Sequence, residues 1–289
     1  MEFLKQMRSG YRSNYYHCWV HAVDVLCASQ RLLARVQKHI PAVERLALLS
    51  SALIHDVDHP GVPNSKLIED ESEWALVYVS QLGFAMHLLT AVACCVSAVY
   101  LCNSYNDVSP LENRSIFVAS RALRTPKCNF VKNLPSADRR RVRQVMCDVV
   151  LATDVTHKQR EAVNEKLLNE VVEAGVDYTN ESHRMTVLRT ILTCADISST
   201  TAAFPLFIRW GSRLFHEIRA FNPDLDAEGF AAMQDGFLEK VRAGTIAGIA
   251  ISWPWQLIVA GGRLQLGHLS VWTNFALPAD NWSPGFGQT

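Results

Sequence analysis

Residues 50–61 read SSALIHDVDHPG, a stretch that joins an apolar helical pattern to a group of metal-binding residue types. His55, Asp56, Asp58 and His59 fall within five positions, directly before a Pro-Gly pair that ends a helix. Two imidazoles and two carboxylates gathered at the end of a helix indicate a metal site. The remaining ligands must come from other parts of the chain.

Helical patterns dominate the sequence. Apolar residues recur three and four positions apart in residues 14–36, without Pro or Gly, and a second such pattern runs from Pro41 to Asp56. Similar patterns cover residues 137–152, 159–174, 183–197, 205–220 and 227–242. Alternating runs typical of strands are almost absent before residue 243. We therefore predict an all-α protein, a compact multi-helix bundle with a binuclear metal site between helices.

Composition excludes some classes of partner. The 289 residues are 49% hydrophobic, and 28 basic side chains balance 28 acidic ones, so no overall field favours nucleic acid or anionic lipid. The eight cysteines form no C-x-x-C pair, which fits reduced thiols, and the first residues contain no apolar signal region. We expect a cytoplasmic protein that binds no nucleic acid; its oligomeric state cannot be read from the sequence.

Further ligands can come from two helical stretches. His17 and His21 are four residues apart and would share one helix face. Asp196 closes the apolar pattern of 183–197, where a cation would relieve the cost of burying an unpaired carboxylate. Two imidazoles and two carboxylates suit Zn²⁺, and a neighbouring site with one shared carboxylate and waters suits Mg²⁺ or Mn²⁺. This set predicts a two-metal hydrolase in which one of His17 and His21 is a ligand and the other the general acid.

The same residues resemble the spaced ligands of HD-type metal phosphohydrolases. Flanking residues narrow the resemblance to the catalytic domain of class I cyclic nucleotide phosphodiesterases. The family motif Tyr-His-Asn-x-x-His-Ala-x-Asp-Val is matched by YHCWVHAVDV at 16–25, and its strongest signature by HDVDHPGVPNSKLI at 55–68. SPLEN (109–113), VLATD (150–154) and LTCADIS (192–198) follow in family order, so the match runs from about residue 14 to 242.

The resemblance implies a role for each matched residue. His17 would be the general acid for the leaving 3′ oxygen. The ligands of Zn²⁺ would be His21, His55, Asp56 and Asp196, of which Asp56 also bridges to a second ion, Mg²⁺ or Mn²⁺. Residues matching positions that hold waters of the second ion are His59, Glu112 and Thr153. Residues matching the nucleotide pocket are Tyr16, Leu214, Gln234 and Phe237.

The function that the resemblance implies is hydrolysis of cAMP or cGMP to the 5′-monophosphate, with a small-molecule cyclic nucleotide as partner. A choice between the two cannot be read, because a glutamine amide can rotate to serve either base. The chain departs from the family at Cys18, which replaces the motif asparagine, at Arg114, which replaces a histidine, and at Ser199, which replaces an asparagine. These departures leave two alternatives open: a catalytically impaired module that binds nucleotide and metal as a scaffold, and a broader HD-type nucleotide phosphohydrolase.

Two stretches do not follow the helical pattern. Residues 82–102 contain no charged side chain and are long enough to span a membrane. A single span there would place His55 and Asp196 on opposite sides of a bilayer, so we expect none. We predict a catalytic domain at 1–242, with residues from about 79 to 104 as an insertion that is either packed on the surface or translated from a retained intron. The tail at 243–289 stays unassigned.

Overall fold

The computed structural model describes residues 2–70, 108–156, 166–171 and 173–243. Within these residues the regular elements are all helical, which confirms the predicted fold class. The predicted insertion at 79–104 and the tail beyond residue 243 lie outside the described residues. The chain divides into two compact units, Met1–Glu217 and Ile218–Thr289. The predicted domain boundary at residue 242 stays a prediction.

In chain order, the longer helices of the first unit begin with α1 (Glu2–Gly10), α2 (Trp19–Ala34), α3 (Ala42–Ile54) and α4 (Asn64–Glu69). They continue with α7 (Pro110–Ala122), α8 (Ser136–Leu151), α10 (Glu181–Asp196) and α11 (Phe204–Phe221). Two short 3-10 helices, η1 (Gln37–His39) and η3 (Ile197–Thr201), follow α2 and α10. α11 crosses the division between the units, and α12 (Ala227–Ala243) belongs to the second unit, which is described by itself.

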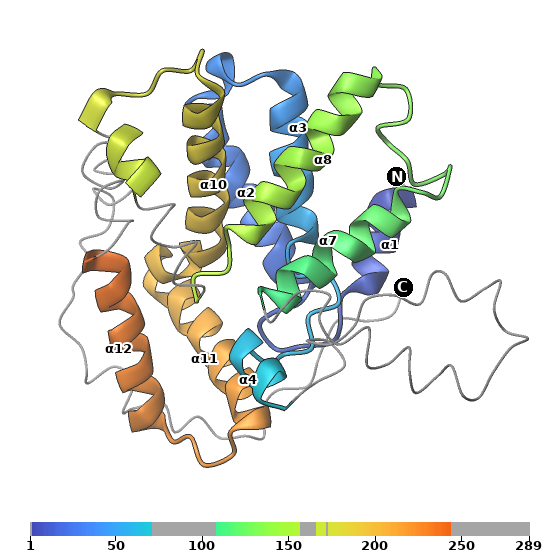
Figure 1. Cartoon of the computed structure of the whole chain (residues 1–289). Helices are drawn as coiled ribbons and strands as arrows, with labels where there is room; N and C mark the ends of the chain where they lie inside the picture. The colour runs from blue at the N-terminus through green and yellow to red at the C-terminus, as the bar shows by residue number, and fades with distance from the viewer. Residues whose placement is uncertain (1, 71–107, 157–165, 172, 244–289) are drawn as a thin grey trace, which may run out of the picture. The chain divides into compact units, whose positions relative to one another are not determined.

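Four helices form the core of the first unit. α3 packs against α2 and α8, and α10 packs against α2, α3 and α8 (Figure 1). Small residues allow the close approach of these helices, because Ala22, Ala47 and Ala195 are completely buried. Around them lie Leu48 and Leu188, also with no exposed surface, and burial of a leucine side chain stabilises a fold by about 1.5–3 kcal/mol. The metal-binding residue types therefore sit on helices that the core holds firmly.

Three helices that the sequence patterns did not predict support this core. α1 contacts α7, and α4 contacts α7 as well. α1 has only nine residues and buries only Phe3 and Met7, too few for a repeating apolar pattern. α7 buries Ser115 and Ala119 on its inner face, and these small residues give little hydrophobic signal. In the pattern predicted at 159–174, residues 159–165 and 172 lie outside the described residues, and the others are helical, as predicted.

No single helix among the described residues is long and apolar enough to cross a membrane. The helices Glu181–Thr200 and Phe204–Phe221 pass that test only when taken together, on length and composition, and they are bent by 96° where they meet. The apolar residues 82–102 lie outside the described residues.

A buried carboxylate joins three of the helices. Glu44 of α3 has a side chain that is 3% exposed, and it accepts hydrogen bonds from Arg141 of α8 and Arg184 of α10. The nitrogen–oxygen distances lie between 2.6 and 3.3 Å. Arg141 also donates to Glu181, whose side chain is 60% exposed. Two guanidinium groups thus share one buried counter-charge.

We expect Glu44→Ala to lower the free energy of unfolding by about 3–5 kcal/mol, because it removes the buried carboxylate that two partly buried guanidinium groups share. Urea denaturation followed by circular dichroism measures this loss. Glu181→Ala is the matched control, since it removes an exposed carboxylate from the same arginine and should cost less than about 1 kcal/mol. Equal losses in the two variants would show that burial of Glu44 has no special effect.

Candidate metal centre and active site

The loop that follows α3 carries the densest group of polar side chains. α3 ends at Ile54, two residues before the end of the predicted pattern at Asp56, and His55 is its C-cap residue. Asp58 has a φ of 67°, which is costly for a residue with a β-carbon, by about 1–2 kcal/mol. Its backbone N–H donates to the carbonyl of Gly10 at 3.0 Å, and the Ser115 hydroxyl donates to the carbonyl of Val57 at 3.1 Å. Residues of α1 and α7 thus hold the loop in this conformation.

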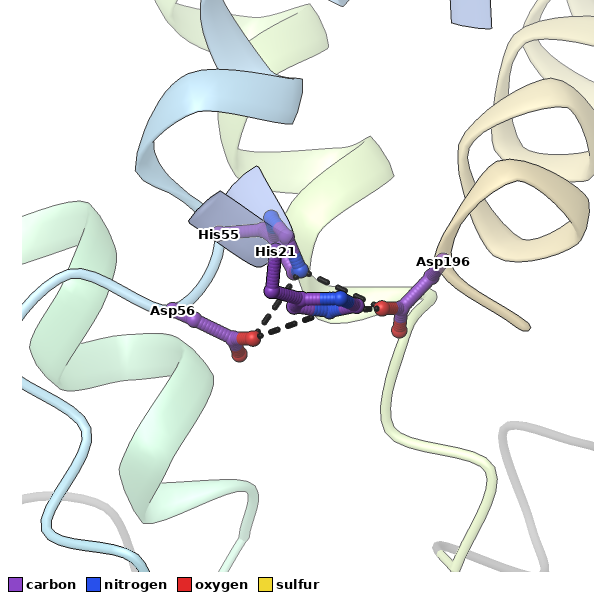
Figure 2. A group of neighbouring side chains, drawn as sticks. All are labelled: His21, His55, Asp56 and Asp196. Carbon is purple, nitrogen blue, oxygen red and sulfur yellow. Dashed lines mark hydrogen bonds and ion pairs between the residues drawn. The ribbon is translucent and has the colours of Figure 1, made fainter. Parts of the chain in front are cut away.

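The four predicted metal ligands converge at one point (Figure 2). They come from the start of α2, the end of α3 and the last residue of α10: His21, His55, Asp56 and Asp196. One ligand atom from each lies within 4.8 Å of the others. Asp196 Oδ1 is 2.9 Å from His21 Nε2 and 3.2 Å from His55 Nε2. Asp56 Oδ2 is 3.1 Å from His55 Nε2 and 3.5 Å from His21 Nε2.

The hydrogen bonds of these residues fit a cation at this point. His55 Nδ1 lies 3.0 Å from the carbonyl of Ala52, and because a carbonyl only accepts, Nδ1 carries the proton. In a neutral His55 ring, Nε2 then directs a lone pair toward the carboxylates. Asp56 Oδ2 is buried and has no hydrogen-bond partner among the described residues. Acceptors that face one another in a buried place require a positive charge between them. Four nitrogen and oxygen donors suit a divalent transition ion.

The protonation equilibria of the cluster show that its carboxylates favour a positive charge beside them. Burial acts to lower the pKa of His55, but the charges of Asp56 and Asp196 outweigh it and raise that pKa well above its usual value. Burial acts to raise the pKa of each carboxyl group, and the histidines reverse this, so both carboxyl pKa values fall well below the usual range. The two carboxylates are therefore ionised at neutral pH and hold positive charge beside them.

His17 does not lie on α2, which corrects the expectation that His17 and His21 share a helix face. α2 begins at Trp19, and Cys18 before it has the extended backbone angles φ −128° and ψ 174°. The backbone N–H groups of Tyr16 and His17 donate to Glu217 Oε2 at 2.6 and 3.0 Å, and this carboxylate replaces a further turn of helix. The rings of His17 and His21 are nevertheless 6.0 Å apart, so His17 lies beside the cluster.

Glu217 of α11 is a site residue that sequence reasoning missed. Its Oε1 is hydrogen-bonded to His17 Nδ1, and its side chain is 6% exposed. Burial acts to lower the pKa of His17, but the hydrogen bond to Glu217 and the nearby carboxylates raise it above its usual value. The only local signal was spacing: Glu217 follows Trp210 by two helical turns, and a carboxylate on the buried face of a helix is unusual.

His59 stacks on His17. Their ring centroids are 3.9 Å apart with an angle of 18° between the planes. His59 Nδ1 accepts the backbone N–H of Gly61 at 3.0 Å, so the proton of the neutral ring is on Nε2. Burial and the neighbouring His17 lower the pKa of His59 to about 3, so the ring is neutral at physiological pH. His17, His59 and Glu217 also lie within metal-binding distance of one another, but the Nδ1 hydrogen bonds of both rings explain this group without an ion.

The two other residues predicted to hold waters lie on different elements. Glu112 on α7 accepts a hydrogen bond from Asn64 at 2.9 Å. Burial and the charge of Asp154 raise the pKa of Glu112 to about 7, and Asp56 contributes to the same shift, so Glu112 is within electrostatic reach of the cluster. The hydroxyl of Thr153, just after α8, donates to the carbonyl of Val150 at 2.8 Å and leaves its oxygen lone pairs to accept.

The residues predicted for the nucleotide pocket fall in both units. Tyr16 packs its ring against His21 at 4.7 Å and Trp210 at 5.4 Å. Leu214 is half-buried on α11, one turn after Trp210. Gln234 and Phe237 lie on α12 in the second unit, so their role in the pocket stays a prediction.

The three departures from the family motif have defined surroundings. Arg114 donates from Nε and Nη2 to Asp58 Oδ2 at 3.1 and 2.9 Å, and Arg12 donates to the other oxygen of Asp58. Ser199 shares a hydrogen bond of 3.2 Å with the Tyr16 hydroxyl. Cys18 is buried and accepts a hydrogen bond from an arginine of α11. The four ligands of the cluster converge with these residues in place.

Comparison with known proteins agrees with the geometry. The profile of the family described as 3'5'-cyclic nucleotide phosphodiesterase matches residues 16–98 and 94–232. The rat 3',5'-cyclic-AMP phosphodiesterase 4C is 30% identical over 262 residues, which are 86% of this chain and 44% of the relative. A probable 3',5'-cyclic-AMP phosphodiesterase of Caenorhabditis elegans is 28% identical over 223 residues, 74% of this chain and 29% of the relative. The chain thus spans less than half the length of these curated relatives.

A solved structure shares the fold. The phosphodiesterase domain of the Salpingoeca rosetta rhodopsin phosphodiesterase superposes with a TM-score of 0.73 at 28% sequence identity. The similarity covers 90% of this chain and 75% of that domain.

We expect Asp196→Asn to lower the affinity for Zn²⁺ by at least about 100-fold, because loss of a residue that only supports a ligand already costs about 10–100-fold. The metal content of protein purified with added Zn²⁺ and then dialysed, measured by mass spectrometry, checks this. The matched control is Asp148→Asn, which makes the same change at an ion pair with Arg189 on the surface of α8 and α10. Wild-type protein that holds no stoichiometric ion would contradict the metal centre.

Proposed function

Because this chain belongs to the 3'5'-cyclic nucleotide phosphodiesterase family, we propose that it hydrolyses the 3′ ester of a cyclic purine nucleotide to the 5′-monophosphate. The observation that carries the proposal is the convergence of His21, His55, Asp56 and Asp196 beside the hydrogen-bonded pair of His17 and Glu217. The first group can bind a cation and the second can supply a proton. Hydrolysis of a phosphodiester requires both.

In this proposal the four clustered residues bind Zn²⁺, and Asp56 also faces a second ion, Mg²⁺ or Mn²⁺. His59, Glu112 and Thr153 would hold the water ligands of that second ion. When bound, the two ions lower the pKa of a coordinated water and polarise the phosphoryl oxygens. The residues of the chain hold this chemistry in place, since α2, α3 and α10 fix the ligands from three directions.

His17 would donate the proton to the leaving 3′ oxygen. Glu217 is bound to Nδ1, so the ring presents Nε2 to the substrate and keeps a defined orientation. The carboxylate also raises the pKa of His17, which keeps the ring protonated at a higher pH than a free histidine. Once the proton has gone to the 3′ oxygen, Glu217 holds the neutral ring in place for its return.

The substrate would be cAMP or cGMP. The curated relatives named above are cAMP phosphodiesterases, so cAMP is the first nucleotide to test. Tyr16 and Leu214 would line the pocket, with Gln234 reading the purine and Phe237 stacking on it. Ser199 takes the place of an amide that faces the base in the family, so the Tyr16 hydroxyl here meets a serine hydroxyl.

A module that binds nucleotide without turnover is the competing proposal. It is favoured by the presence of Arg114 where the family has a histidine, because a guanidinium near the second ion would repel it. Against it stands the ion pair of Arg114 with Asp58, which neutralises the charge locally. A broader nucleotide phosphohydrolase is disfavoured by the order of the family motifs along the chain.

We expect purified protein with Mg²⁺ or Mn²⁺ to hydrolyse cAMP, cGMP or both, and His17→Ala to lower kcat by about 100-fold or more while metal content stays unchanged. Chromatographic detection of the 5′-monophosphate checks this. His39→Ala is the matched control, since His39 is exposed and stacks on Tyr178. Turnover that does not depend on His17 would remove it as the proton donor, and nucleotide binding without turnover would favour the module.

The hydrogen bond from His17 Nδ1 to Glu217 leads to a prediction about pH. A protonated His17 is required for donation, so activity falls as pH rises through the pKa of this histidine. Glu217→Gln removes the negative charge that raises this pKa, and the basic limb of the pH–kcat profile should therefore move to lower pH. Stopped assays from pH 6 to pH 10 measure the shift. A limb that stays in place or moves to higher pH would contradict the role of Glu217.

A further inference from the structure

Asn14 makes a contact that neither the family motif nor the proposed mechanism includes. Its side-chain Nδ2 donates to two carbonyl oxygens, that of His17 at 3.0 Å and that of His59 at 2.7 Å. These two histidines come from segments more than forty residues apart in the sequence, and their rings are stacked at 3.9 Å. We infer that Asn14 is a positioning residue, which fixes the proton donor His17 over the loop that carries the metal ligands. The inference rests on the proposed function.

The direction of the amide follows from chemistry. Both carbonyl oxygens can only accept, so the NH₂ group must face them, and both of its protons are used. A carboxylate in the same place would put a negative charge against two carbonyl dipoles. The contact therefore depends on an amide donor and not only on the size of the side chain.

The other side of the amide is closely surrounded. Gly61 has a φ of +84°, and a β-carbon added there would lie 3.5 Å from both Asn14 Oδ1 and Glu217 Cγ. Asn14 and Glu217 thus approach the same glycine, whose N–H is bonded to the ring of His59. The ring of His17 is bonded through Nδ1 to Glu217, and its carbonyl is bonded to Asn14, so the residue is held at both ends.

This arrangement explains why His17 can act from outside a helix. Residues 15–18 have no helical structure, and a catalytic group on such a segment needs other contacts to keep it in place. A misplacement of about 1 Å can cost about 100-fold in rate. Loss of the Asn14 amide should therefore weaken proton donation, while the four metal ligands, which come from other helices, stay where they are.

A pair of substrates can separate positioning of the proton donor from general damage. In hydrolysis of a cyclic nucleotide the leaving group is the 3′ oxygen, a poor leaving group that needs the proton. Hydrolysis of bis(4-nitrophenyl) phosphate releases 4-nitrophenolate, which departs without one. With Mg²⁺ or Mn²⁺ present, we expect Asn14→Asp to lower kcat for the cyclic nucleotide about 30-fold, between no effect and the loss in His17→Ala. KM, metal content and the rate with the nitrophenyl ester should change less than about 3-fold.

Two further variants complete the test. Asn180→Asp is the matched control, because Asn180 caps α10 by accepting the N–H of Ser182 at 2.9 Å, a role that aspartate keeps. Asn14→Ala removes the donor without adding charge and should show the same selective loss, which covers the case in which Asn14→Asp fails to fold. Equal losses with both substrates, or loss of metal, would show a merely structural role. Unchanged cyclic nucleotide turnover in both Asn14 variants would overturn the inference.

Histidine-ring chemical shifts give a readout that does not depend on turnover. In protein labelled at histidine, the stacked His17 and His59 rings should shift each other's signals, and Asn14→Asp should reduce that effect while the signals of His21 and His55 stay in place. Wild-type protein that hydrolyses no cyclic nucleotide would defeat the proposed function. The histidine-ring chemical shifts would then still decide whether Asn14 positions His17. Unchanged chemical shifts of His17 and His59 in Asn14→Asp would overturn the inference.

Discussion

Two carboxylates and two histidine rings lie close together in the interior, and this electrostatic constraint is the one on which the rest of the structure depends. His55 donates a hydrogen bond from Nδ1 to the carbonyl of Ala52, and its Nε2 lies 3.1 Å from Asp56 Oδ2 and 3.2 Å from Asp196 Oδ1. Lone pairs in such a place repel unless a proton or a cation lies between them. The packing of α2, α3 and α10 in one core holds the four side chains against that repulsion. The helical bundle therefore serves as a rigid support for a cation.

The neighbouring group around His17 follows the opposite principle. In the metal cluster the buried oxygen Asp56 Oδ2 has no hydrogen-bond partner among the described residues. Around His17, by contrast, the N–H groups of Tyr16 and His17 and the ring of His17 all bond to Glu217. A neutral His59 ring lies against His17, and Asn14 donates hydrogen bonds to the backbone carbonyls of both residues. A satisfied network of this kind fixes the orientation of one ring, which is what the proposed role of His17 as proton donor requires.

Departures from the family motif are accommodated by local contacts. Arg114 brings a positive charge to α7, and Asp58 neutralises it while also binding Arg12. The same aspartate has a positive φ, so the two arginines hold the loop at a strained residue. Ser199, which replaces an amide, bonds to the hydroxyl of Tyr16. These substitutions change the surroundings of the cluster, and the four ligands still converge.

The sequence by itself determined the helical class, the helices near whose ends the candidate ligands lie, and the residue types of those ligands, because periodicity, Pro-Gly signals and residue chemistry are local properties. It could not determine that His17 precedes α2, since the carboxylate that displaces the first helical turn lies 200 residues further along the chain. The sequence patterns did not identify Glu217 and Asn14 as site residues for the same reason. In the sequence, Glu217 resembles any charged helix residue and Asn14 any turn residue, and only the fold places them around His17. Only tertiary structure decides such contacts, because they join segments that share no local pattern.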